Sequence, residues 1–118
     1  MPLIPTEALP HFENMIYLPM LITILERDRN LFEKGPFKLK GPYVNLVNQA
    51  SNFVRAELKD TTIYLRRHNM KVIRSKTDDT FTEYVFMHGG YEEHRRYLNV
   101  RLRNRTEELI SVYFAMAE

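Results

Sequence analysis

Cysteine is absent from the 118-residue sequence. Its absence excludes disulfide bridges, thiolate metal sites and cysteine nucleophiles, and it fits a reducing compartment. Glycine occurs only four times, and no glycine-rich loop stands before a predicted helix, where it could bind a phosphate group. No serine lies in the strand–turn–helix setting of a nucleophile elbow. We therefore expect a non-catalytic protein that holds no cofactor and no metal ion.

A long hydrophobic segment is absent as well. The longest nearly uncharged run, residues 15–25, is about half as long as a membrane-crossing helix must be. We expect no signal peptide, because a basic leading segment and a small-residue cleavage site are missing. The sequence thus predicts a cytoplasmic protein without a membrane partner.

The composition is that of a folded domain. Hydrophobic residues make up 44% of the chain and charged residues 27%, both ordinary for globular proteins. The length predicts a single domain over residues 1–118. The net charge is only +2, but residues 66–105 hold ten basic against five acidic side chains, a net charge of +5. The positive charge is therefore concentrated in one segment.

The first half of the chain predicts two helices. Three of the six prolines fall in the first eleven residues, so residues 1–16 are expected to be irregular. Residues 17–34 follow a helical period, in which Pro19 must lie in the first turn or kink the helix. A second helix is predicted over residues 43–68, after two Gly-Pro pairs that bracket a short loop. Helices joined by a short loop should pack antiparallel.

The second half changes to a period of two, which is typical of strands. Residues 71–77 and 80–87 are rich in β-branched and aromatic residues and are separated by the turn pair Asp78-Asp79. Gly89-Gly90 then predicts a tight hairpin. Leu98, Val100 and Leu102 alternate, which favours a third strand through that stretch. Residues 106–117 combine a helix-like start with strand-forming side chains, so we favour a fourth strand and keep a helix as the alternative.

These elements predict an α+β fold. Two N-terminal antiparallel helices would pack on one face of a three- or four-stranded antiparallel meander that occupies residues 71–116. Such a two-layer arrangement leaves the other face of the sheet without a helix. That open face is where a binding site is expected.

Counting outward from a two-residue Gly89-Gly90 loop assigns side chains to the two faces. Phe81, Glu83, Val85, Met87, Leu98, Val100 and Leu102 share the mainly apolar face, which we expect to pack against the helices. The opposite face combines aromatic and basic side chains: Tyr84, Phe86, Arg95, Tyr97, Arg101 and Arg103. Rings beside guanidinium groups could bind single-stranded nucleic acid. The alternative is that protein covers these rings, either the chain itself or a second copy.

A row of charges is predicted on the apolar face. A two-residue turn at Asp78-Asp79 would place Arg74 beside Glu83, and the hairpin places Arg96 on its other side. We interpret Arg74, Glu83 and Arg96 as a structural ladder that fixes the strand register, since an uncompensated buried charge is costly.

Three functional hypotheses follow. The first is a protein-interaction module that forms a homodimer, or binds another protein, through the aromatic sheet face or the C-terminal strand. The second is binding of single-stranded RNA or DNA by the basic and aromatic face. The third, which no motif supports, is an enzyme or small-ligand site around Arg74, Glu83 and His94.

Overall fold

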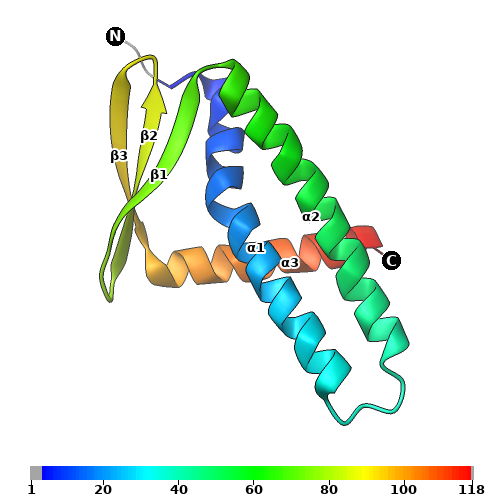
Figure 1. The fold of residues 1–118 in the computed structure, drawn as a ribbon. Helices are drawn as coiled ribbons and strands as arrows, with labels where there is room; N and C mark the ends of the chain where they lie inside the picture. The colour runs from blue at the N-terminus through cyan, green and yellow to red at the C-terminus, as the bar shows by residue number, and fades with distance from the viewer. Residues whose placement is uncertain (1–3, 118) are drawn as a thin grey trace.

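The structure, a computed structural model, describes residues 4–117. A short 3-10 helix and three α-helices flank a three-stranded antiparallel sheet of order β1-β2-β3 in these residues: η1 (Thr6–Ala8), α1 (Leu9–Lys34), α2 (Gly41–Arg67), β1 (Met70–Thr77), β2 (Phe81–His88), β3 (Tyr91–Leu98) and α3 (Asn99–Ala117). Figure 1 shows α1 and α2 as a long antiparallel hairpin, with the sheet beside its upper half and α3 crossing it. The predicted α+β class and the antiparallel meander are confirmed.

Helix α1 begins earlier than predicted. It starts at Leu9, so the expectation of an irregular segment up to residue 16 is wrong for residues 9–16. Pro10 lies in the first turn, where its missing N–H would have no partner in any case. Pro19 lies inside the helix, and Figure 1 shows the axis of α1 changing direction along its length. The prolines that suggested an irregular lead-in are therefore compatible with a bent helix.

Residues Thr6–Lys34 form a helical segment that is long and apolar enough, by length and composition alone, to cross a membrane. The core helix of a soluble protein has the same property. In α1 the apolar side chains Phe12, Leu21 and Leu25 are fully buried against the rest of this chain.

Helix α2 confirms the sequence prediction closely. It runs from Gly41 to Arg67, against a predicted range of residues 43–68, and Pro42 lies in its first turn. Its buried side chains recur at helical spacing along one face: Val47, Ala50, Val54, Thr61 and Leu65. Amphipathic periodicity over seven turns is the strongest local signal in this sequence, which explains the success of the prediction.

The C-terminal element is a helix, and the predicted fourth strand is wrong. Strand β3 ends at Leu98 and α3 starts at Asn99, so Val100 and Leu102 lie on a helix rather than on a strand. Asn99 fixes the change of direction. Its backbone N–H donates to the Thr80 carbonyl and its side-chain amide to the Asp78 carbonyl, both at 2.8 Å.

Packing explains why residues 99–117 are helical despite their β-branched and aromatic content. Wound as a helix, the segment buries Leu102, Thr106 and Tyr113 on one side. Tyr113 joins a cluster of buried side chains from α1 and α2, among them Leu21 and Val54. A strand would split this set between two faces, so tertiary contacts override the local propensity.

The pairing of β2 with β3 follows the predicted register. Glu83 opposes Arg96, Tyr84 opposes Arg95 and Val85 opposes His94. Both turn glycines have positive φ, 54° at Gly89 and 85° at Gly90, a conformation that tight hairpins demand and that other residues rarely adopt. The hairpin prediction is confirmed.

The pairing of β1 with β2 differs by one residue from the prediction, because Arg74 opposes Tyr84 and not Glu83. The Asp78 carboxylate accepts the N–H groups of Phe81 at 2.7 Å and Thr80 at 2.8 Å, and these two hydrogen bonds lower the pKa of Asp78. The turn therefore centres one residue later than predicted. An irregularity between Arg74 and Thr77 then shifts the register back by one residue.

The helices cover the face of the sheet that the sequence analysis expected to be open. Tyr84 is 5% exposed and Phe86 only 1%. The ring of Phe86 stacks on Phe12 of α1 at a centroid distance of 4.7 Å, and both rings belong to a cluster with Ile16 and Leu102. The predicted orientation of the sheet is therefore wrong. The face without a helix is the one that carries Glu83, His94 and Arg96.

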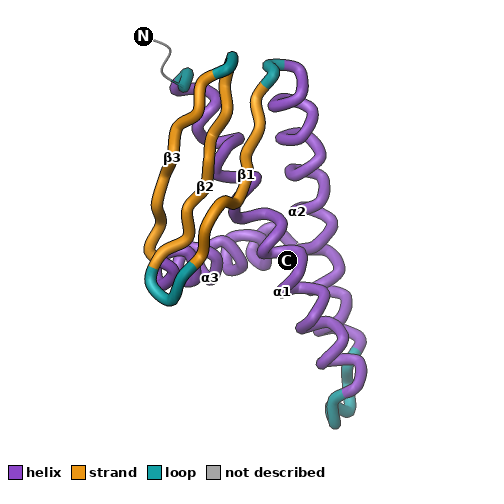
Figure 2. The backbone as a smooth tube through the Cα atoms, turned by 60° about the vertical axis from the view of Figure 1, so that its left-hand side comes forward, coloured by secondary structure: helices purple, strands orange, loops and turns teal. Residues whose placement is uncertain are grey.

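The molecule is elongated. Its principal extents are 58 × 33 × 18 Å and its radius of gyration is 16.4 Å, whereas a compact domain of this length has about 13.5 Å. The α1–α2 hairpin extends well beyond the sheet, as Figure 2 shows. Much of the surface therefore comes from helices that have one face exposed to solvent.

Replacing Phe86 by Ala tests which face is buried. We expect the free energy of unfolding to fall by about 3–5 kcal/mol, because the change leaves a cavity against Phe12. Phe53→Ala, at a 41%-exposed site on α2, is the control and should cost less than about 1 kcal/mol. Urea denaturation followed by circular dichroism measures both. A small effect at Phe86 would contradict the packing of the sheet on α1.

Candidate functional site

The aromatic members of the predicted binding site lie under the helices. Tyr84 and Phe86 are buried on β2, and Tyr97 on β3 is half-buried, with its ring edge-on to Tyr84 at 5.8 Å. Burial raises the pKa of Tyr84 and of Tyr97 above the ordinary value of 10.0. These rings are therefore part of the core and are not free to stack on a nucleic-acid base.

The basic members are dispersed. Arg95 lies at the edge of the covered face, where it pairs with Glu93 and has its guanidinium 4.9 Å from the centre of the Phe86 ring. Arg101 and Arg103 are exposed on α3, not on a strand. Two positions apart on a helix, they point roughly 160° away from each other. The structure does not bring the predicted set together on one surface.

Only two of the three residues of the predicted charge ladder share a face, and these two form no ion pair with each other. Glu83 and Arg96 are opposed on the open face of the sheet, but Arg74 opposes Tyr84 and so belongs to the other face. The prediction for Arg74 is wrong because of the shifted turn. The guanidinium of Arg96 lies 4.1 Å from the centre of the Phe81 ring, a cation–π contact that holds it flat on the sheet.

The side chain near Glu83 is that of His94 on β3, whereas the sequence analysis expected Arg74 on β1. Its Nδ1 lies 3.4 Å from Glu83 Oε1 and its Nε2 lies 3.5 Å from Glu92 Oε2. Within residues 4–117 no group of three or more His, Asp and Glu side chains is arranged to hold a metal ion. The open face is thus a mixed, partly ion-paired surface, on which Val85 is only 7% exposed.

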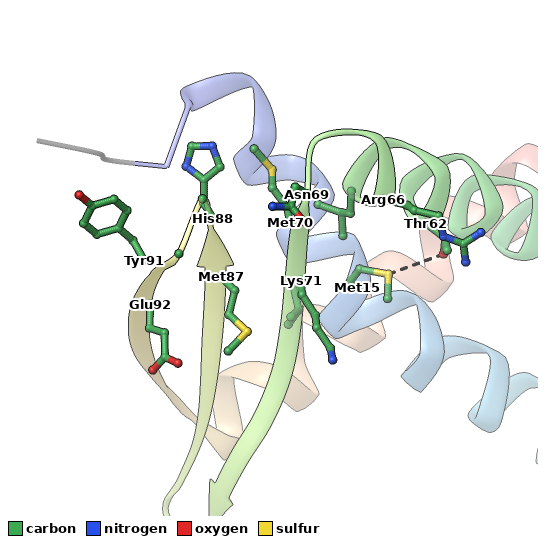
Figure 3. Close-up of a pocket in the computed structure, with 14 residues that line it drawn as sticks. Met15, Thr62, Arg66, Asn69, Met70, Lys71, Met87, His88, Tyr91 and Glu92 are labelled. Carbon is green, nitrogen blue, oxygen red and sulfur yellow. Dashed lines mark hydrogen bonds between the residues drawn. The ribbon is translucent and has the colours of Figure 1, made fainter.

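A pocket of about 720 Å³ lies where α2 ends and β1 begins. The left-handed backbone of Asn69, with φ of 55°, makes the sharp turn between these two elements. Figure 3 shows that the polar side chains lining the pocket point in different directions. Arg66 and Lys71 lie on one side, while His88, Tyr91 and Glu92 surround the hairpin turn. The polar groups do not converge on one point, as a catalytic site would require.

A second hollow, an apolar groove of about 680 Å³, runs between α1 and α3. We call it the α1–α3 groove. One wall comes from the internal proline of α1 and the turn that follows it: Pro19, Met20, Thr23 and Ile24. The other wall comes mainly from α3: Leu102, Arg103, Thr106, Glu107 and Ile110. Sequence reasoning missed this groove because it placed the second wall on a strand. The i, i+4, i+11 spacing of Leu102, Thr106 and Tyr113 was the signal that could have revealed it.

The rim of the groove carries two opposite charges. Arg103 and Glu107 are exposed, one helical turn apart on α3. Neither side chain forms an ion pair with another residue of the described chain, whereas the nearby Arg105 pairs with Glu108 at 3.0 Å. The groove therefore combines an apolar floor with unpaired charges of both signs. This arrangement suits a partner surface that is apolar at its centre and carries the opposite charge at each of the two rim positions.

The buried tyrosines predict a loss of stability in alkali. The pKa of Tyr84 is raised in the folded state, so its contribution is fully present below pH 10.0 and is lost as the pH rises through the folded pKa. We expect the free energy of unfolding to fall above this pH, and to fall less in Tyr84→Phe. Urea denaturation at neutral and alkaline pH tests this. An identical pH dependence in the variant would show that Tyr84 is not desolvated.

Comparisons with known proteins place the chain. No solved structure matches it. The YhjD protein family matches residues 3–118. A relative from Bacillus subtilis (strain 168), whose printed name is "Uncharacterized protein YhjD", is 34% identical over 113 residues, which cover 96% of this chain and 94% of the relative. The match spans the helical hairpin, the sheet and α3 alike. The chain therefore belongs to the YhjD protein family.

Proposed function

We propose that the protein is a non-catalytic, cytoplasmic interaction module that self-associates through the α1–α3 groove. The observation that carries this proposal is the groove itself, an apolar hollow of about 680 Å³ with Arg103 and Glu107 unpaired on its rim. An exposed apolar groove with a polar rim is typical of a protein contact site. The absence of cysteine fits a reducing compartment.

A second copy fits the groove because the rim charges are self-complementary. In a twofold dimer the same patch meets itself. Two α3 helices run antiparallel when the twofold axis is perpendicular to them. If Arg103 of one copy opposes Glu107 of the other, the symmetric pair forms at the same time. The same register places Val100 opposite Ile110. Val100 is 51% exposed in the single chain, so the dimer would also cover an apolar side chain.

The surface area of the chain supports a partner. The chain exposes 8210 Å², whereas a compact monomer of 14.1 kDa exposes about 6,700 Å². The surplus is about 1,500 Å², and a standard interface buries about 800 Å² on each partner. The elongated shape therefore leaves enough area for a stable contact.

Two other routes to association or binding have weaker support. Residues 106–117 offer no strand that could extend the sheet, because they are helical. The rings expected to stack on single-stranded nucleic acid are packed in the core. Self-association through helices thus has the stronger geometric support.

Size-exclusion chromatography with light scattering tests the proposal. At tens of micromolar we expect twice the chain mass of 14.1 kDa for the wild type. Ile110→Glu should give a monomer, because it buries an unpaired charge that costs about 3 kcal/mol or more, over a hundredfold in the dissociation constant. The matched control is Val112→Glu, at a 51%-exposed site on the same helix but turned away from the groove. A monomeric wild type would contradict the proposal.

A charge exchange tests the antiparallel register. Arg103→Glu places two like charges opposite each other and should weaken the dimer about tenfold or more. Adding Glu107→Arg to the same chain reverses both charges and should restore the wild-type mass. Failure of the second change to rescue the first would show that these two side chains do not meet across the interface.

A further inference from the structure

The end of the helical hairpin, far from the sheet, exposes an unusual set of apolar side chains (Figures 1 and 2). We call residues 31–43 the hairpin tip. Leu39 is 75% exposed, Leu31 59%, Tyr43 50% and Phe37 45%. This tip lies away from the α1–α3 groove, so the self-association proposed above does not account for its exposure.

The tip is held in one shape by its own aromatic residues. The ring of Phe32 lies 5.3 Å from Phe37 and 5.5 Å from Tyr43, and Phe37 lies 6.2 Å from Tyr43. Phe37 also packs over Gly35, where an added Cβ would come within 2.7 Å of the ring. Pro36 and Pro42 restrict the backbone on both sides of the loop. Leu39, in the loop between these prolines, is the most exposed of the large apolar side chains of the tip.

Positive charge surrounds the exposed side chains. The tip holds three lysines, Lys34, Lys38 and Lys40, against one acidic residue, Glu33, a net charge of +2. The ammonium group of Lys40 donates to the Glu33 carbonyl and so closes the end of α1. Lys34 and Lys38 form no ion pair within the described chain, which leaves both free for an external anion.

We propose that the hairpin tip docks on the surface of an anionic lipid bilayer. Leu39 would enter the boundary between headgroups and acyl chains, Tyr43 and Phe37 would lie at the headgroup level, and the lysines would contact lipid phosphates. Exposed leucine and aromatic side chains among lysines are the features of proteins that bind at the bilayer interface. The chain lies on the membrane in this mode, and its core remains packed.

The shape of the tip favours a bilayer over a protein partner. Two helices side by side are about 20 Å wide, so the end of the hairpin offers a small footprint of a few hundred Å². A stable protein interface needs about 800 Å² from each partner. A bilayer imposes no such requirement, because it adapts to a convex surface and adds a diffuse negative potential.

Flotation with lipid vesicles tests the proposal on the full chain. We expect binding to vesicles of phosphatidylcholine mixed with phosphatidylglycerol, weaker binding at high salt, and none to phosphatidylcholine alone. Lys34→Gln and Lys38→Gln should each lower the partition coefficient about fivefold, and Leu39→Glu should abolish binding. Val112→Glu, remote from the tip, is the control. Lack of binding to the anionic vesicles, or equal binding by the Leu39 variant, would overturn the proposal.

The absence of tryptophan permits a direct reporter. A single tryptophan placed by Leu39→Trp should shift its emission to the blue when anionic vesicles are added, while Val112→Trp should not. Circular dichroism establishes that both variants are folded. A blue shift of the Leu39→Trp emission with rising protein concentration, in the absence of lipid, would mean that a second copy covers the tip and would also overturn the proposal.

Discussion

The stacking of Phe12 on Phe86 is the contact on which the rest of the structure depends. It joins the first turns of α1 to the central strand, with the ring centroids 4.7 Å apart, and both side chains are almost completely buried. Aromatic pairs of this kind contribute large apolar areas and prefer a defined geometry. The pair therefore decides which face of the sheet meets the helices.

The chemistry of the two faces follows from this contact. With Tyr84 and Phe86 covered, the opposite face must accommodate Glu83, His94 and Arg96, and solvent access makes that inexpensive. The end of β3 is fixed by hydrogen bonds to the neighbouring turn. Asn99 binds the β1–β2 turn through its backbone and side chain, and α3 leaves the sheet toward the helical hairpin. The α1–α3 groove lies between α3 and the stretch of α1 that begins at Pro19.

The two proposed surfaces belong to different parts of an elongated molecule. The groove lies beside the sheet and the hairpin tip lies at the far end. In a dimer the protein would carry two tips. If both face the same bilayer, two weak contacts on one surface bind much more tightly than either alone, because the second contact forms at a high effective concentration. Self-association and membrane docking would then strengthen each other without sharing a residue.

The sequence by itself determined the elements with a strong local signal. It was possible to predict α2 from its long amphipathic pattern, and to predict the β2–β3 register from the two hairpin glycines. Helical amphipathicity and positive φ both act within a few residues. The candidate site was not. Large apolar side chains occur on both faces of β2, with Phe86 and Tyr84 on one and Val85 and Met87 on the other, so a period of two cannot say which face is covered.

Only the tertiary structure decided the rest. Phe12 and Ile16 selected the face of the sheet, although prolines had suggested that their segment was irregular. The cluster of Tyr113 with Leu21 and Val54 selected a helix for residues 99–117, whose composition favoured a strand. In each case the deciding energy is burial against residues distant in the chain, which no local pattern contains.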